Sequence, residues 1–276
     1  MIESSGPHLA QQEQHDTMST PTLSIAEPVP FDANAFASHA LSSAATLAAV
    51  FDHTLLKPDA TRAQVIRLCH EAAEHRFACA MINPMWVSVA AETLAGTGVP
   101  VGVVIGFPLG ASLSASKRDE TARVLKLGAH VVDMVLNIGL LKSGSKEDYE
   151  AVKQDIRGVV ELAHGAGGIV KVVLETCLLT FEEKHRASEL ALAAGADSIQ
   201  TSTGFSSGGA TVDDISLMRG VVGARAGVKA SGGIRSLADA SAMLHAGATR
   251  IGASASVKIL AELSGHSAAS STGNGH

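Results

Sequence analysis

The sequence predicts a single (β/α)8 barrel that runs from residue 41 to residue 264. Two observations predict it: short β-branched runs alternate with segments of helical periodicity, and the alternation occurs eight times. The chain length of 276 residues, 46% of them hydrophobic, also suits one barrel of about 250 residues. We therefore expect one closed parallel sheet surrounded by helices.

The eight expected strands are short β-branched runs at 50–54, 77–82, 101–106, 131–137, 169–175, 197–201, 227–230 and 249–253. Helical periodicity follows the strands, for instance at 62–75, 116–127, 147–163, 181–194 and 236–246. An open doubly wound sheet shows the same alternation, but it normally carries a glycine-rich turn after its first strand. Phe51-Asp52-His53-Thr54 occupies that place, which favours the closed barrel.

The two ends of the chain differ from the alternating region. Residues 1–40 mix Gln, Ser, Pro and His without a period, and residues 265–276 are small and polar. Such compositions are typical of segments that do not fold by themselves. We expect a disordered N-terminal extension over 1–40 and a disordered tail over 265–276.

Composition excludes several classes of protein. The net charge of -6 comes from interspersed acids and bases, so no nucleic-acid partner is expected. No apolar run approaches the roughly 18 to 20 residues of a membrane span, and the first forty residues lack the pattern of a signal peptide. The three cysteines are widely spaced and form no CxxC pair, which argues against a disulfide framework or a zinc ribbon. We expect a cytoplasmic protein without a membrane partner.

Glycines and small hydroxyl residues follow the sixth, seventh and eighth expected strands. The segments are 201–205 (TSTGF), 231–235 (SGGIR) and 252–254 (GAS). Glycine lets backbone N–H groups approach an anion, and helix N-termini attract negative charge. Glycines that only make tight turns are the alternative for any one loop, but three adjoining loops favour a phosphate site.

Three charged residues lie within expected strands: Asp133, Lys171 and Lys229. Charges inside a barrel are costly unless they are paired, so we expect the three to face one another. A carboxylate opposite two ammonium groups could relay protons. The alternative is a buried ion-pair network that only fixes the register of the strands.

Six strings resemble deoxyribose-phosphate aldolase, in the same order and spacing: FDHTLLKP, VVDMVLNIGLLKSG, KVVLETCLLT, TSTGFSSGGAT, VKASGGIR and ATRIGASA. The resemblance implies reversible cleavage of 2-deoxyribose 5-phosphate into acetaldehyde and glyceraldehyde 3-phosphate, through a lysine Schiff base and without a metal or organic cofactor. It implies a proton-relay pair, Asp133 and Lys229, supported by Lys171. The implied substrate contacts are Asp52, Thr54 and Thr201, and the implied phosphate-binding residues are Gly204, Gly232, Gly233, Gly252 and Ser254.

One position departs from the family pattern. The Schiff-base lysine of the family immediately precedes TSTG, and this chain has Gln200 there. A carboxamide nitrogen is delocalised into its carbonyl and cannot form an iminium, so we expect conventional activity to be lost or strongly reduced.

Four interpretations of this departure remain open at this stage. Lys229 or Lys171 could replace the nucleophile; Lys229 and Gln200 could donate hydrogen bonds to an enolate in a non-covalent lyase or isomerase. The chain could also be a phosphosugar-binding pseudoenzyme, or an altered copy of an active enzyme.

His53, His130 and His185 do not have the spacing of metal ligands. The expected partners are a small phosphorylated sugar or aldehyde and a second copy of the chain in a homodimer.

Overall fold

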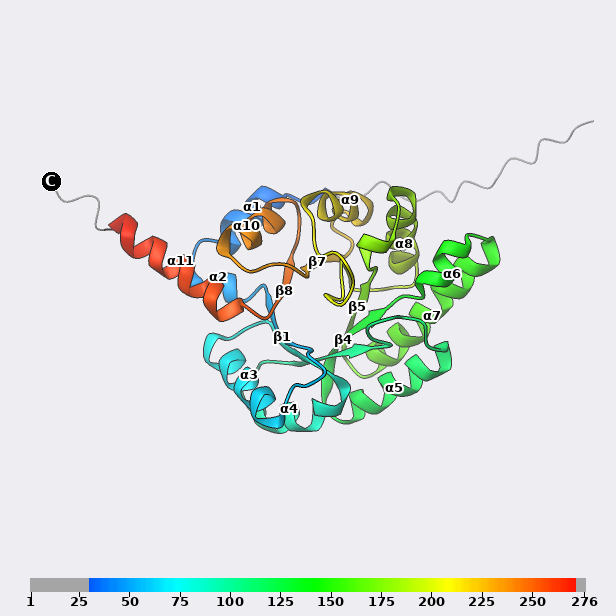
Figure 1. Cartoon of the computed structure of the whole chain (residues 1–276), viewed down its shortest axis with the longest axis horizontal. Coiled ribbons are helices and arrows are strands. Elements are labelled where there is room, and N and C mark those ends of the chain that lie inside the picture. The colour runs from blue at the N-terminus through cyan, green and yellow to red at the C-terminus, as the bar shows by residue number, and fades with distance from the viewer. Residues whose placement is uncertain (1–29, 272–276) are drawn as a thin grey trace, which may run out of the picture.

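The computed structural model describes residues 30–271, and the side chains of residues 30–265. Eight parallel strands close into a barrel in sequence order, with β1 paired to β8. Helices surround the strands on all sides (Figure 1). The strands are β1 Phe51–Leu55, β2 Cys79–Ile82, β3 Val101–Ile105, β4 Ala129–Val135, β5 Ile169–Val173, β6 Ser198–Gln200, β7 Gly227–Ser231 and β8 Arg250–Ala253. The predicted (β/α)8 fold is confirmed, and each strand boundary lies within two residues of its expected place.

The outer ring begins with two helices that precede the first strand. The helices are α1 Ala33–Ala40, α2 Ala44–Ala48, α3 Arg62–His75, α4 Val87–Thr93, α5 Ser114–Lys126, α6 Ile138–Ser143, α7 Lys146–Gly165, α8 Phe181–Ala193, α9 Val212–Val222, α10 Leu237–His245 and α11 Ser256–Ser271, with 3₁₀ turns η1 Pro84–Trp86 and η2 Thr176–Leu178. Thr61, Thr180 and Ser236 begin α3, α8 and α10 with reciprocal capping boxes. Each hydroxyl satisfies an N–H group that the first helical turn leaves free. These caps fix where each helix starts after its strand.

Helix α1 corrects the expectation that all of residues 1–40 are disordered. Asp32 caps this helix by accepting a hydrogen bond from the N–H group of Ala35, and Ala37 and Ala40 are buried. The helix lies beside α10 (Figure 1). Its buried face consists of alanines, which carry too weak an apolar signal for the period to be recognised in the sequence. Residues 1–29 lie outside the described part of the chain.

The expected C-terminal tail is also partly wrong. Helix α11 continues to Ser271, whereas the sequence predicted that order ends at residue 264. This stretch contains Ala and Ser, small residues that can continue a helix already anchored by buried Ile259 and Leu260. Residues 272–276 lie outside the described part of the chain.

The main apolar core lies between the strands and the helices. A second, smaller apolar cluster comprises Cys79, Met81, Val104 and Val131, all from β2, β3 and β4. Interior-facing positions of such barrels are packed with side chains rather than open. Within the described residues, no helix is long and apolar enough to cross a membrane. Strands β1, β4, β5 and β7 contribute charged side chains to the barrel, and these form the candidate site.

Candidate active site

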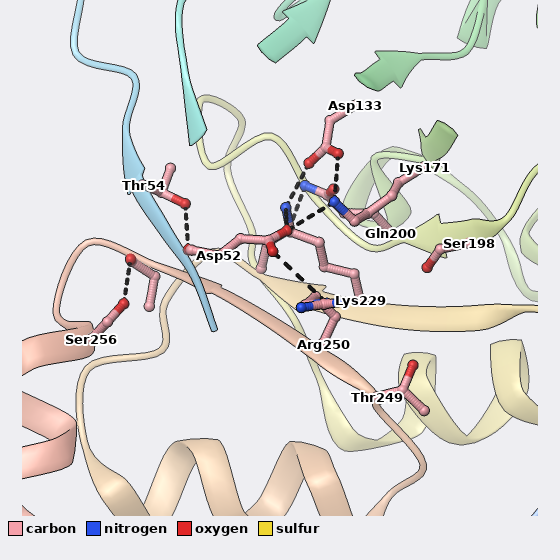
Figure 2. A network of polar contacts seen from close by, with 12 residues as sticks. Asp52, Thr54, Asp133, Lys171, Ser198, Gln200, Lys229, Thr249, Arg250 and Ser256 are labelled. Atoms are coloured by element: carbon pink, nitrogen blue, oxygen red, sulfur yellow. Dashed lines mark hydrogen bonds and ion pairs between the residues drawn. The ribbon is translucent and has the colours of Figure 1, made fainter. Parts of the chain in front are cut away.

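Four charged side chains meet inside the barrel (Figure 2). Lys229 Nζ lies 2.5 Å from Asp133 Oδ2 and 2.7 Å from Asp52 Oδ2. Lys171 Nζ lies 3.1 Å from Asp133 Oδ1 and 3.0 Å from Asp52 Oδ2. Each ammonium group therefore bridges the same two carboxylates. The predicted meeting of Asp133, Lys171 and Lys229 is present in the structure.

Strand register explains how these residues come together. In the β4–β5 pair Asp133 stands opposite Lys171, and in the β1–β8 pair Asp52 stands opposite Gly252. A Cβ atom at Gly252 would lie 2.8 Å from Lys229 Cε, because the lysine side chain passes this position. The missing side chain on β8 therefore lets Lys229 on β7 reach Asp52 on β1.

The two carboxylates are not equivalent. Asp133 accepts hydrogen bonds from both lysines, whereas Asp52 contacts them as ion pairs and also lies 3.8 Å from Arg250 Nε. Burial tends to raise the pKa of Asp52, but the charges of Lys171, Lys229 and Arg250 outweigh it and hold the pKa well below its usual value. Asp52 therefore stays ionised and fixes the two lysines from the side opposite Asp133.

Burial also tends to lower the pKa of Lys171, yet Asp133 and Asp52 together raise it above its usual value. A lysine must lose its proton before it can attack a carbonyl carbon. Lys171 also does not contribute to the cavity described below. Both observations argue against Lys171 as the replacement nucleophile that the sequence left open.

A cavity of about 320 Å³ opens above this charged cluster, at the C-terminal ends of the strands. Asp52 and Thr201 are fully buried and do not line it, so of the three implied substrate contacts only Thr54 does. The predicted site residues in its lining are Thr54, Asp133, Gln200, Gly204, Lys229, Gly232, Gly233, Gly252 and Ser254. Residues from β1, β4, β6, β7 and β8 and their loops thus converge on one volume.

Gln200 ends β6 beside the charged cluster and stands opposite Lys229 in the β6–β7 pair. Its side-chain Nε2 donates to the backbone oxygen of Ser202 at 3.2 Å and to Ser231 Oγ at 3.0 Å. Ser231 Oγ in turn donates to the same oxygen of Ser202 at 2.6 Å. The carboxamide is therefore held by the start of the β6–α9 loop and by the end of β7.

The mouth of the cavity carries two exposed cations that the sequence interpretation did not assign, Lys57 and Arg235. Lys57 belongs to the string FDHTLLKP and Arg235 to VKASGGIR. A charged residue just after a strand can contact a ligand or only solvent, and the sequence around it does not distinguish the two cases. Together with Lys229 they give the lining three positive charges against the single carboxylate of Asp133. The cavity therefore suits an anionic ligand.

Not every helix N-terminus near the mouth is free for an anion. The carboxylate of Asp239 accepts from the N–H groups of Arg235 and Ser236, and Glu262 accepts from that of Leu237. The first turn of α10 is therefore already occupied by carboxylates. The glycine loops and Ser254, which lies between β8 and α11, are the better candidates for a phosphate.

Glu175 supports the β6–α9 loop, a role that no sequence pattern indicates. Its backbone is left-handed, with φ 56°, and its carboxylate is buried and accepts from the N–H and hydroxyl groups of Thr203. Thr203 Oγ1 accepts in turn from the N–H group of Phe205, whose ring contacts that of Phe107 across the mouth. Non-glycine residues rarely adopt this conformation, so the surrounding contacts must stabilise it.

A second buried pair holds the end of β4, just beyond Asp133. Lys117 Nζ donates to the backbone oxygen of Val135 at 2.9 Å and lies 2.5 Å from Asp155 Oδ2. Neither side chain reaches the cavity, so this pair is structural. Among the described residues no group of three or more His, Cys, Asp or Glu side chains could hold a metal ion.

Comparison with known proteins shows which protein family this chain is similar to. The family model for DeoC/LacD family aldolases matches residues 46–267. A deoxyribose-phosphate aldolase from Geobacillus sp. (strain WCH70) is 54% identical over 214 residues, which cover 78% of this chain and 94% of the relative. One from Streptococcus sanguinis (strain SK36) is 56% identical over 209 residues, covering 76% and 93%. The tetrameric deoxyribose phosphate aldolase from Aeropyrum pernix superimposes with a TM-score of 0.78 at 35% identity, covering 84% of this chain and 97% of that one.

Proposed function

Because the chain belongs to the DeoC/LacD family of aldolases, we propose that it binds a small sugar phosphate of the 2-deoxyribose 5-phosphate type in the barrel mouth. We propose further that its Schiff-base cleavage to acetaldehyde and glyceraldehyde 3-phosphate is lost or strongly reduced. The observation that carries the second part is Gln200, which lines the cavity next to an intact cluster of Asp133, Lys229, Lys171 and Asp52.

Gln200 blocks the covalent route for two reasons. An amide nitrogen shares its lone pair with the carbonyl and does not add to an aldehyde. In addition, Nε2 is engaged as a hydrogen-bond donor to Ser202 and Ser231. Without an iminium, electrons released when the carbon–carbon bond breaks have no sink, so the remaining groups can move protons but cannot stabilise the carbanion in the usual way.

Of the two lysines that line the cavity, Lys57 lies at the mouth and Lys229 lies beside Gln200, so Lys229 is the candidate for a replacement nucleophile. Its ammonium group is paired with both Asp133 and Asp52, so it would have to leave these partners and lose a proton before it could attack. In the proposed function Lys229 and Asp133 keep the role of a proton-relay pair. The phosphate is bound by Gly204, Gly232, Gly233, Gly252 and Ser254, with Lys57 and Arg235 neutralising its charge.

A non-catalytic phosphosugar-binding protein is the second candidate. It is favoured over a non-covalent enolate-forming enzyme by one observation: Nε2 of Gln200 already donates to two protein oxygens and is not available to an enolate. The retained Asp133–Lys229 pair favours residual catalysis instead, because a buried ion pair is costly to keep without a use. Measured turnover separates these two candidates.

The test is cleavage of 2-deoxyribose 5-phosphate, followed through a dehydrogenase that reduces the aldehyde products. We expect kcat/KM of the natural chain to lie at least about 10³-fold below that of the Gln200→Lys variant, as for loss of other catalytic nucleophiles. Gln200→Met serves as a matched control and should be as inactive as the natural chain. A natural chain within tenfold of Gln200→Lys would overturn the proposal.

Location and assembly belong to the same proposal. The three cysteines are free thiols, which fits a cytoplasmic protein in a reducing environment. A homo-oligomer is proposed by analogy with the tetramer of the Aeropyrum pernix relative, and a homodimer is its smallest form. Size-exclusion chromatography with light scattering measures this state directly.

A further inference from the structure

Glu175 has an unusual backbone conformation at a point where the pairing of β5 with β6 becomes irregular. Its φ is 56°, in the left-handed region. The N–H group of Leu174 donates to the backbone oxygen of Gln200. The N–H group of Thr176 donates to that of Thr201. Between these two bonds the β5 chain advances by two residues and the β6 chain by one, so Glu175 is an extra residue, as in a β-bulge. Bulges and strained residues are frequent beside active sites, where they direct a side chain.

The side chain of Glu175 places a charge in the interior without a cation beside it. The residue is 2% exposed, and its carboxylate accepts from the N–H group of Thr203 at 3.2 Å and from the hydroxyl group of the same residue. The thiol of Cys177 is a further donor at 3.9 Å, and among the described residues no lysine or arginine pairs with this carboxylate. Because a buried carboxylate is costly without donors, it binds the groups of Thr203 firmly.

Thr203 extends this support to the next residue, Gly204. The hydroxyl group of Thr203 accepts from the N–H group of Phe205, so the residues on both sides of Gly204 are held. Gly204 has φ 83°, and its own N–H group has no hydrogen-bond partner among the described residues. All three residues line the cavity. A backbone N–H group that is fixed and unpaired can donate to an anion there.

The β6–α9 loop also contacts the glycines that follow β7. The N–H group of Ala210 donates to the backbone oxygen of Gly232 at 3.0 Å. A Cβ atom at Gly209 would lie 2.4 Å from the same oxygen, and one at Gly232 would lie 3.8 Å from the Cα atom of Gly204. The two loops therefore pack backbone against backbone, so a displacement of the first would also displace the second.

We propose that Glu175 is a positioning residue for the phosphate group of the ligand. By holding Thr203, its carboxylate fixes the β6–α9 loop and keeps the N–H group of Gly204 and the adjoining loop at Gly232 in place for a phosphate. Glu175 does not line the cavity, so it acts through the loop and not by touching the ligand. This inference rests on the proposed sugar-phosphate site and adds a residue on which the affinity of that site depends.

The test compares variants of Glu175 in the full chain, with 2-deoxyribose 5-phosphate and inorganic phosphate as probes. Calorimetry measures the dissociation constants, and urea unfolding verifies that each variant is folded. Glu175→Met removes both acceptor oxygens at similar size, and we expect both dissociation constants to rise about tenfold. Glu175→Gln keeps an oxygen that can accept from Thr203, so it should bind both probes within about threefold of the natural chain.

Asp155→Asn is the matched control, because Asp155 is also a buried carboxylate but neither it nor its partner Lys117 lines the cavity. This change should lower the free energy of unfolding and leave both dissociation constants unchanged, since the molecules that stay folded bind as before. Thr203→Val tests the other end of the contact: it removes the hydroxyl group and should raise both dissociation constants about three- to tenfold. Thr203→Ser keeps the hydroxyl group and should stay within about threefold.

The outcomes separate this inference from the proposed function. If folded Glu175→Met binds both probes within about threefold of the natural chain, the positioning role is refuted while the sugar-phosphate site stands. The same result for Thr203→Val refutes it if Glu175→Met does not fold. A loss in Glu175→Gln or Asp155→Asn as large as that in Glu175→Met would also refute it, because the hydrogen bonds to the loop would not be the cause. If neither probe binds the natural chain, the sugar-phosphate site itself is refuted, and the inference with it.

Discussion

The close approach of Gly252 to Lys229 leads to a prediction whose size follows from the structure. A Cβ atom at position 252 would lie 2.8 Å from Lys229 Cε and 3.1 Å from Ser231 Cβ. Carbon atoms in ordinary contact lie about 3.5 to 4.0 Å apart, so Gly252→Ala should displace the lysine by about 0.7 Å or more. That displacement acts on Nζ contacts of 2.5 Å and 2.7 Å, which have little room to change.

The effect is measured in the Gln200→Lys background, where turnover is expected. A misplacement of about 1 Å in a catalytic group can cost about 10²-fold, so we expect Gly252→Ala to lower kcat/KM by about 10- to 100-fold. Overpacking should also reduce the free energy of unfolding by about 1 to 3 kcal/mol, measured by urea denaturation.

Gly220→Ala provides the matched control, because apart from its chain neighbours and the nearby backbone of its own helix no atom lies within 4 Å of its Cβ position, and its backbone is not left-handed. In α9 this change should be neutral or stabilise by up to about 1 kcal/mol. If Gly252→Ala keeps kcat/KM within twofold of its parent, clearance at β8 does not position Lys229 and the reasoning is wrong.

Three further predictions concern stability and reactivity. The ring of Phe31 lies 4.1 Å from the guanidinium centre of Arg219. Phe31→Ala should therefore lower the free energy of unfolding, measured by urea titration, by about 0.5 to 2 kcal/mol. An unchanged free energy would mean that this contact does not stabilise the fold. Asp52→Asn should destabilise by about 3 to 5 kcal/mol near neutral pH. Because folding lowers the pKa of Asp52, its contribution to the free energy of unfolding is present above its unfolded pKa of about 3.9 and is lost as the pH falls toward its folded pKa. The difference in unfolding free energy between the natural chain and Asp52→Asn should therefore narrow below about pH 4. A difference that stays constant would contradict the lowered pKa. Cys177 is exposed and should react rapidly with a thiol reagent. Cys69 and Cys79 are buried, and burial raises the pKa of both thiols, so they should react only when the protein unfolds. Rapid modification of all three thiols would contradict the fold.

The strands and the helices named from their periodicity could be predicted because each carries a strong local signal. Short β-branched runs mark the strands, and Thr or Ser caps open several of the helices that follow them. Helix α1 could not be recognised in this way, since its buried residues are alanines and it depends on packing against α10. Sequence periodicity thus reports large apolar side chains and misses helices whose contacts are made by small ones.

The site shows a similar division. That Asp133, Lys171 and Lys229 meet could be predicted, because charges within buried strands must find partners. Which lysine reaches the cavity could not, because that depends on register and on the absence of a side chain at Gly252. The role of Glu175 was equally hidden, since its contact with Thr203 joins the ends of two strands through a left-handed backbone.

The central claim is that Gln200 removes the covalent step while the rest of the site stays intact. Borohydride reduction in the presence of 2-deoxyribose 5-phosphate or acetaldehyde, followed by intact and peptide mass spectrometry, tests it most directly, with Gln200→Lys as the positive control. We expect a stable adduct at position 200 in Gln200→Lys and none in the natural chain. A reduced adduct on Lys229 or Lys171 of the natural chain would show that the nucleophile has moved, and would contradict the account.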